Sequence, residues 1–213
     1  MKILNLYAGI GGNRKLWEGH DITAVELNPD IAKIYQDFFP NDTMVIGDAH
    51  QYLLDHFKEF DFIWSSPPCP THSRARYWGY SATRPVYIDM KLYQEIVLLQ
   101  THYSDLWVVE NTIPYYKPLI EAKKIGRHLF WSNFGLANIK AIDGDIHAGT
   151  NSEFESLLGY DLSPYSVTTE KYKGARAKLE ILRNCVVPET GLHILNTAIG
   201  AIPQIQEGLF GDH

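Results

Sequence analysis

The sequence predicts an α/β fold built on a mostly parallel, doubly wound sheet. Three observations predict it: apolar segments of strand length recur between residues 2 and 111, helical patterns separate them, and glycine or proline stands at several of the junctions. Strands that alternate with helices form parallel sheets covered on both faces. No internal repeat or linker divides the 213 residues, so we expect one domain spanning residues 1–213.

The elements can be assigned in chain order. The clearest helix is residues 28–40, which has proline near each end and apolar residues Ile31, Ile34, Tyr35 and Phe38 at helical spacing. Beyond residue 120 the pattern weakens, and polar loop material is expected up to about residue 150. Strands are predicted at 2–9, 22–26, 44–49, 61–66, 106–111 and 128–134, and helices at 13–20, 28–40, 51–60, 87–103 and near 191–202.

Composition excludes several classes of protein. With 45% hydrophobic and 21% charged residues, the chain is neither disordered nor fibrous. No apolar stretch has the length of a membrane span, and the N-terminus lacks the pattern of a signal peptide. We therefore expect an intracellular protein, cytoplasmic or nucleoid-associated, in which Cys69 and Cys185 are free thiols. The nine histidines show no paired metal-ligand spacing, so no metal site is predicted.

The net charge of -6 argues against a broadly basic nucleic-acid-binding surface. Local charge differs from the total, because residues 72–91 and residues 170–183 each hold more arginine and lysine than aspartate and glutamate. The sequence thus places two basic segments on an acidic body.

A glycine-rich loop, Tyr7 to Gly12, follows the first predicted strand, where doubly wound sheets bind ligands. Glu26 ends the second strand, where a carboxylate can accept hydrogen bonds from ribose hydroxyls, and Asp48 ends the third. The loop departs from G-x-G-x-x-G, which disfavours a dinucleotide and favours a phosphate-free nucleoside such as S-adenosylmethionine. The glycines alone are equally consistent with a plain tight turn.

A cysteine and a carboxylate follow the next two strands. Cys69 lies in Ser66-Pro67-Pro68-Cys69-Pro70, directly after the fourth strand, and Glu110-Asn111 ends the fifth. Catalytic groups belong at this edge of a parallel sheet, so we expect the two side chains to act together.

With these motifs the chain resembles the DNA (cytosine-5-)-methyltransferase family. Pro68-Cys69 and Glu110-Asn111 match the nucleophile motif and the Glu-Asn motif of that family in kind and order, and Tyr7 to Gly12 is similar to its cofactor loop. Arg127 resembles the last arginine of Gln-x-Arg-x-Arg, residues 183–188 resemble the late Gly-Asn-Ser-Val-x-Pro motif, and residues 153–160 resemble another late motif. The resemblance implies a Rossmann-like S-adenosylmethionine-dependent methyltransferase fold.

The family chemistry assigns roles to these residues. The thiolate of Cys69 would add to cytosine carbon 6, Glu110 would hydrogen-bond the ring, and Arg127 would stabilise the thiolate and orient the base. The base that removes the carbon 5 proton is not identified, and Cys185 is expected to be structural. The S-adenosyl-L-methionine-binding set is expected to be Tyr7, Ala8, Gly9, Ile10, Gly11, Gly12, Glu26, Leu27, Asp48, Ala49, Pro67, Asn184 and Val186.

Chemistry on a stacked base requires base flipping, and residues 71–80 are the expected nucleic-acid loop. This segment combines arginines with aromatic side chains, although a solvated surface loop is the competing interpretation. The nucleic-acid-binding set is expected to be Ser73, Arg74, Arg76 and Arg84.

The chain lacks most of the target-recognition domain usual in the family, and leaves a reduced recognition region at about residues 135–180. Ile125 also stands where the family motif has its first arginine. Low sequence selectivity and a separate specificity subunit are therefore both open.

Three functions remain to be separated. The primary expectation is methylation of DNA cytosine at carbon 5, with RNA as the alternative substrate. A catalytically silent nucleic-acid-binding relative is disfavoured by the intact Cys69 and Glu110, and a nucleotide-dependent oxidoreductase has no use for that pair. The target site, the source and the oligomeric state are not predicted.

Overall fold

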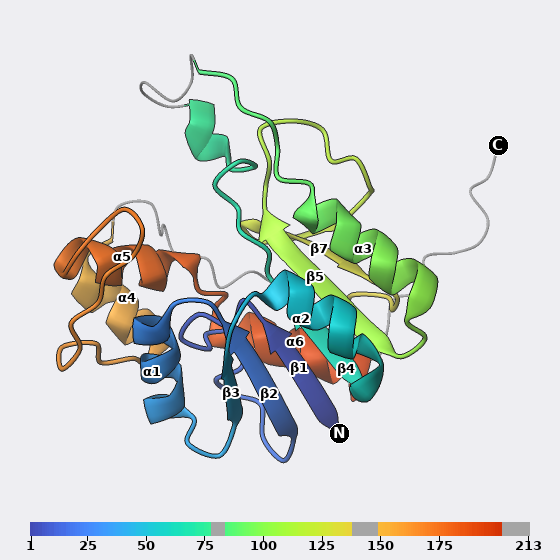
Figure 1. The fold of residues 1–213 in the computed structure, drawn as a ribbon, viewed down its shortest axis with the longest axis horizontal. Coiled ribbons are helices and arrows are strands. Elements are labelled where there is room, and N and C mark those ends of the chain that lie inside the picture. The colour runs from blue at the N-terminus through green and yellow to red at the C-terminus, as the bar shows by residue number, and fades with distance from the viewer. Residues whose placement is uncertain (78–83, 138–148, 202–213) are drawn as a thin grey trace.

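The computed structural model describes residues 1–77, 84–137 and 149–201 (Figure 1). In these residues, a seven-stranded sheet has the order β3-β2-β1-β4-β5-β7-β6. Strands β1 to β5 pair in parallel, whereas β7 pairs antiparallel with both β5 and β6. The strands are β1 (Lys2–Leu6), β2 (Asp21–Glu26), β3 (Thr43–Ile46), β4 (Phe62–Ser65), β5 (Leu106–Thr112), β6 (Lys123–Ile125) and β7 (His128–Ser132).

The helices begin where the sequence offers caps. Asn28 caps the first helix with its side chain and Pro29 fills the first helical position, while Thr150 and Glu153 form a capping box at the fourth. The helices are α1 (Pro29–Phe38), α2 (Ala49–His56), α3 (Lys91–His102), α4 (Asn151–Leu158), α5 (Ala175–Asn184) and α6 (Pro188–Ala198), with short 3-10 turns η1 (Phe57–Glu59) and η2 (Arg74–Tyr77).

Helices cover both faces of the sheet (Figure 1). On one face, Leu6 and Ile63 of the strands share a core with Leu53 of α2 and Leu99 of α3. On the other face, the strands pack against α6 and α1, and α4 and α5 extend the core beside α1. Side chains alternate between the two cores along each strand, as expected for a sheet buried on both faces.

The predicted fold class is confirmed, but residues 13–20 correct the prediction of a short helix. They form successive turns, with Arg14 N–H bonded to the Gly11 carbonyl and Trp17 N–H bonded to the Arg14 carbonyl. Tertiary contacts determine this path, since the Arg14 guanidinium binds Asp42 at 2.6 Å and a Cβ on Gly191 would overlap the backbone of Asn13.

Other boundaries also differ from prediction. The helix expected at 87–103 begins only at Lys91, because the Asp89 side chain accepts from the Lys91 N–H and Tyr87 is fully exposed. Strand β6 and helices α4 and α5 were not predicted. The expected recognition region, about 135–180, lies partly outside the described residues, and its described part includes α4 and the first turns of α5. No helix within the described part of the chain is long and apolar enough to cross a membrane.

Candidate active site at the carboxyl edge of the sheet

The parallel strands bring the predicted site segments to one edge. Leu6 of β1 is paired with Val25 of β2 and with Ser65 of β4, and Ser65 is paired with Val109 of β5. The segments that follow these positions are the glycine loop, Glu26, the Ser-Pro-Pro-Cys loop and Glu110. Strand register therefore brings these segments to the same edge of the sheet.

Glu26 is tied to the glycine loop by backbone hydrogen bonds. The Gly9 N–H donates to Oε2 at 3.0 Å, and the Asn28 N–H donates to Oε1 at 2.9 Å. Burial raises the pKa of Glu26, and the backbone hydrogen bonds oppose that shift. A carboxylate has about four acceptor sites, so two donors leave capacity for ribose hydroxyls.

Two glycines of the loop, Gly9 and Gly12, lie in different surroundings. Gly9 has φ +55° and no atom within 4 Å of the place of a Cβ, so it faces open space at the sheet edge. Gly12 lies against the late motif, because a Cβ there would approach the Val186 carbonyl oxygen to 2.7 Å and Cys185 Cβ to 2.8 Å. An open edge beside a carboxylate with spare acceptor sites fits the nucleoside part of S-adenosylmethionine.

The other residues of the expected cofactor set lie around this loop in different environments. Asp48 caps α2 by accepting from the His50 N–H, and its other oxygen lies 3.6 Å from Lys91 Nζ. The Pro67 carbonyl accepts from Asn111 Nδ2 at 2.8 Å. The side chains of Ala8, Ile10, Ala49 and Val186 are buried, whereas Leu27 and Asn184 are exposed.

Cys69 is held by the fold of its own loop. Its carbonyl accepts from the His72 and Ser73 N–H groups at 2.9 and 3.0 Å, and the residue as a whole is partly buried. Burial, with a smaller effect from the charge of Glu110, raises the pKa of the Cys69 thiol to about 11. Lys171 and Arg127 lower that pKa, so both cations lie within electrostatic reach of the thiol.

Glu110 is the buried acid of the pair. Burial raises the pKa of Glu110 to about 7, against the hydrogen bond from Ser66 and the charge of Arg127. His128 Nε2 lies 3.6 Å from Glu110 Oε1, but burial and Arg127 lower the pKa of His128 to about 3. The histidine is therefore neutral and the contact is not an ion pair, which leaves Glu110 able to carry a proton near neutral pH.

Arg127 connects this pair to the C-terminal segment. Its Nη2 donates to the Arg183 carbonyl at 2.7 Å and to the Cys185 carbonyl at 2.8 Å. Its Nε is buried and has no hydrogen-bond partner among the residues that the structure describes. An unpartnered buried donor is costly, so Nε is available to a group that enters the site.

Residues 1–103, just under half of the chain, match the model of the C-5 cytosine-specific DNA methylase family. The cofactor that this family implies is S-adenosyl-L-methionine. Glu110 and Arg127 lie beyond the matched segment.

One curated relative is the tRNA (cytosine(38)-C(5))-methyltransferase of Spodoptera frugiperda, 32% identical over 80 residues. The match covers 34% of this chain and 24% of that protein, so the chain corresponds to about a quarter of the relative's length. Similar solved structures include a DNMT2 mutant from Spodoptera frugiperda, with 28% identity, a TM-score of 0.38, and coverage of 52% of this chain and 35% of that chain. Another is a SAM-dependent methyltransferase from Agrobacterium tumefaciens, with 13% identity, a TM-score of 0.36, and coverage of 55% and 40%.

The described residues after Cys69, 70–77 and 84–90, form an arm that projects from the body (Figure 1). Ser73 forms a bridge with Pro114, and Tyr77 Oη donates to the Tyr115 carbonyl. Arg76 Nη2 donates to the Arg84 carbonyl, which joins the two sides of the arm. Residues 78–80 of the predicted nucleic-acid loop lie outside the described residues.

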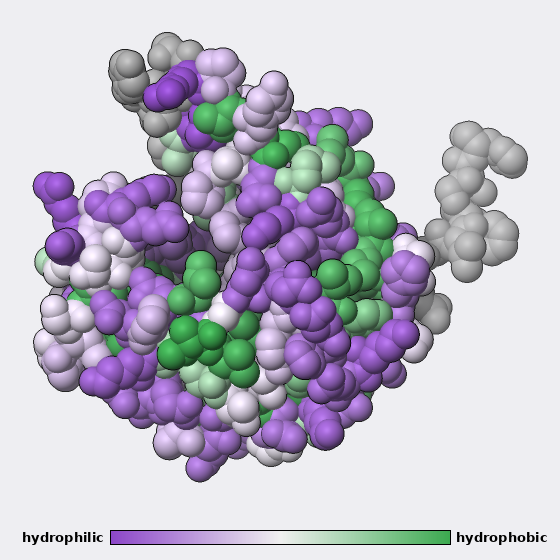
Figure 2. Space-filling model, viewed as in Figure 1, coloured by the Kyte–Doolittle hydropathy of each residue, from purple (hydrophilic) through white to green (hydrophobic). Residues whose placement is uncertain are grey.

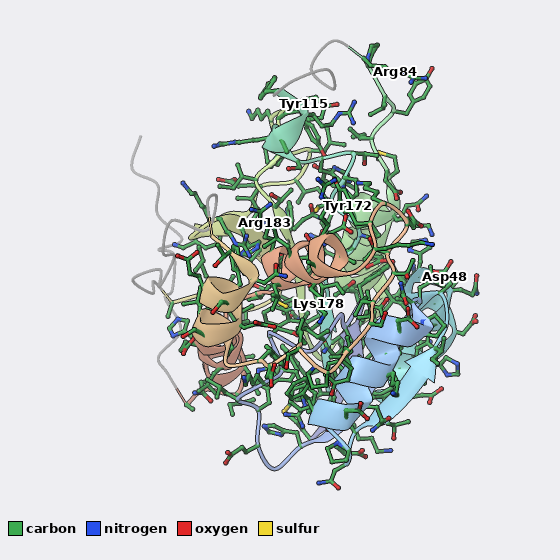
Figure 3. The ribbon with its side chains drawn as sticks, turned by 90° about the vertical axis from the view of Figure 1, so that its left-hand side faces the viewer. Asp48, Arg84, Tyr115, Tyr172, Lys178 and Arg183 are labelled. Carbon is green, nitrogen blue, oxygen red and sulfur yellow. The ribbon has the colours of Figure 1, made fainter. Side chains whose placement is uncertain are left out.

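The described parts of the two basic segments, 72–91 and 170–183, lie on the same side of the molecule (Figure 3). Figure 3 shows Tyr172, Lys178 and Arg183 below Arg84 and Tyr115, and Figure 2 shows hydrophilic side chains on both sides of the hollow between α5 and the arm. Arg74 and Arg84 are exposed. The surface next to the Cys69 loop therefore carries positive charge from both segments.

The sequence did not identify several residues that act on the candidate pair. Ser66 hydrogen-bonds Glu110, His128 lies beside it, and Lys171 lowers the pKa of Cys69. Ser66 and His128 adjoin motif residues, so their positions held a usable signal, whereas the approach of Lys171 depends on tertiary structure. In residues 1–77, 84–137 and 149–201, no group of three or more metal-ligating side chains occurs.

Proposed function

We propose that this chain transfers a methyl group from S-adenosyl-L-methionine to carbon 5 of cytosine in a polynucleotide, through a covalent adduct with Cys69. One observation carries the proposal: the Cys69 thiol follows β4, the buried Glu110 carboxyl group lies near the end of the adjacent parallel strand β5, and the charge of Arg127 acts on both. Neither hydride transfer nor simple nucleic-acid binding requires this combination.

The proposed reaction begins with attack of the Cys69 thiolate on carbon 6 of a flipped cytosine. A protonated Glu110 donates a hydrogen bond to ring nitrogen 3 and so stabilises the negative charge that develops in the cytosine ring. Arg127 lowers the pKa of Cys69 and offers its unpartnered Nε to the base. After carbon 5 gains a methyl group, a base takes the carbon 5 proton, the electrons of that C–H bond restore the ring double bond, and the Cys69 sulfur–carbon 6 bond breaks to release the thiolate.

S-adenosyl-L-methionine supplies the electrophilic methyl group when bound. The chain's contribution is to hold it at the carboxyl edge, with Glu26 accepting from the ribose and the open face at Gly9 allowing close approach. Asp48 and the late-motif residues Asn184 and Val186 complete the expected contacts.

DNA is the primary proposed substrate, since the matched family model is that of DNA methylases. RNA is the second candidate, favoured by the tRNA substrate named for the Spodoptera frugiperda relative. Both substrates present phosphates to Arg74, Arg76, Arg84 and the basic segment 170–183. A separate specificity subunit is compatible with the small recognition region.

Transfer of a labelled methyl group to duplex DNA, single-stranded DNA and tRNA tests the proposal. We expect label at carbon 5 of cytosine in one of these polymers, and none with Cys69→Ser. Label in tRNA alone would replace DNA by RNA as the substrate. Failure with all three polymers, from a chain that binds the cofactor, would favour the silent nucleic-acid-binding relative.

A further inference from the structure

Glu95 is a buried carboxylate that the proposed reaction does not use. It lies in the middle of α3, and its side chain is 0% exposed. A buried charge costs several kcal/mol unless hydrogen bonds compensate it. Its partners therefore indicate which parts of the chain this carboxylate holds together.

Three hydrogen bonds reach Glu95 from three other elements. Tyr7 Oη donates to Oε1 at 2.6 Å, and His50 Nδ1 lies 2.9 Å from the same oxygen. Ser65 Oγ donates to Oε2 at 2.5 Å. Both oxygens of the carboxylate thus have partners within the protein.

Each partner belongs to a segment of the candidate site. Tyr7 opens the glycine loop, His50 lies in the first turn of α2 just after Asp48, and Ser65 ends β4 just before the Cys69 loop. Tyr7 is also the one non-glycine residue with positive φ, +55°, in the described part of the chain. That conformation is sparsely populated for a bulky side chain and persists only where surrounding contacts hold it.

We propose that Glu95 is a positioning residue that fixes the cofactor loop and the nucleophile loop relative to each other. The compensation for its buried charge is complete only when Tyr7, His50 and Ser65 converge on it, so one arrangement of the two loops is favoured. The inference rests on the proposed function for the identity of the cofactor. The link that Glu95 makes between the segments after β1 and at the end of β4 does not depend on the proposed function.

Two readouts test the proposal without methyl transfer: S-adenosyl-L-methionine affinity by calorimetry, and the alkylation rate of Cys69 by peptide mass spectrometry. Glu95→Gln keeps the size of the side chain but weakens all three hydrogen bonds. Cofactor affinity should fall at least about tenfold, the usual effect of losing hydrogen bonds to a charged group. Cys69 alkylation should rise at least about threefold, because its loop opens more often.

Variants that remove a single partner of Glu95 separate its effect on the cofactor loop from its effect on the nucleophile loop. Tyr7→Phe should weaken cofactor binding with little effect on alkylation, and Ser65→Ala should do the reverse. Glu95→Gln combined with Tyr7→Phe should bind the cofactor about as weakly as Glu95→Gln alone, since both remove the same interaction. Gln100→Ala, at an exposed position on the same helix, should change neither readout.

The melting temperature of each variant shows whether it is folded. A folded Glu95→Gln with unchanged affinity and alkylation, or fully additive losses in the double variant, would overturn the proposal. If Glu95→Gln does not fold, the opposite responses of Tyr7→Phe and Ser65→Ala decide it. A wild-type chain that binds no S-adenosyl-L-methionine would refute the proposed function, while alkylation of Ser65→Ala and Glu95→Gln would still decide the role of Glu95.

Discussion

Replacing Glu110 by glutamine is expected to change the two functions of Cys69 in opposite directions. Methyl transfer should fall, because the cytosine ring loses the acid that hydrogen-bonds and stabilises it during attack by Cys69. The reactivity of the free thiol should rise, because the charge of Glu110 is one cause of the raised pKa of Cys69. A residue with a purely structural role would not produce this opposition.

The structure bounds the size of the effect. A thiol with a pKa of about 11 in place of 9.0 has about a hundredfold less thiolate at pH 8, which limits any gain in alkylation. Burial is the larger cause of the raised pKa and remains in the variant. Glu110→Gln should therefore speed alkylation of Cys69 by about three- to tenfold at pH 8.

The effect should depend on pH with a definite sign. The pKa of Glu110 is about 7, so the wild-type side chain is mostly charged at pH 8.5 and mostly neutral at pH 6. Neutral Glu110 does not repel the thiolate. The ratio of the variant rate to the wild-type rate should consequently rise from about one at pH 6 to several-fold at pH 8.5.

Alkylation by iodoacetamide, followed at the level of single peptides, measures this ratio. The peptide assay separates Cys69 from Cys185, which is buried and has a pKa raised to about 12 by burial. Glu121→Gln, an exposed substitution outside the site, is the matched control and should give a ratio of one at each pH. Slower alkylation in Glu110→Gln, or a ratio independent of pH, would refute the electrostatic link between the two residues.

Four further predictions test other parts of the site. Cys69→Ser should reduce methyl transfer by at least about a thousandfold, roughly 4 kcal/mol of barrier, while cofactor binding survives; normal turnover would remove the covalent mechanism. Glu26→Ala should weaken S-adenosyl-L-methionine binding by about 1.5 to 3 kcal/mol in calorimetry. Unchanged affinity would mean that Glu26 binds only the backbone of the glycine loop and not the cofactor. Glu110→Gln should stabilise the fold at pH 8 by at most about 3 kcal/mol in denaturant titrations. The pKa of the Glu110 carboxyl is raised from 4.5 to about 7, so its ionisation destabilises the folded state progressively between these pH values and fully above them. A gain in stability that persists at pH 4 would contradict this electrostatic cause. Arg74→Ala and Arg76→Ala should each reduce the salt dependence of DNA binding by about one in log-log slope, nearly equally for all sequences; bisulfite sequencing that shows a sharply defined site of four or more bases would contradict the low selectivity expected from the small recognition region.

The sequence predicted the part of the fold in which strands and helices are long and regular. From residue 22 to residue 111 each predicted strand exists, and strand register alone brings Cys69 near Glu110. The segment at 13–20 was predicted wrongly because its path is determined by distant partners. Arg14 binds Asp42, and Gly191 packs against the backbone of Asn13, contacts that no local pattern reveals.

The candidate site shows the same division. The motif residues could be placed because cysteine, glutamate and glycine stand at strand ends, where parallel sheets carry their ligands. Glu95 could not be recognised as part of the site, since a single acid on a helix is usually solvated and only the folded chain surrounds it with Tyr7, Ser65 and His50. The environment of Glu110, which sets its pKa, is likewise a product of packing.

Within the proposed function, the raised pKa of Cys69 has a chemical consequence. In the resting protein, burial and the charge of Glu110 both keep the thiol protonated, which protects it from unwanted alkylation and oxidation. While Glu110 keeps its proton in a hydrogen bond to ring nitrogen 3, it does not repel the thiolate, and Lys171 and Arg127 still attract the thiolate. Entry of the base then favours the reactive form of Cys69 at the moment when its target, carbon 6, is in place. The same electrostatic link that Glu110→Gln removes would thus make the nucleophile reactive in the presence of substrate and unreactive without it.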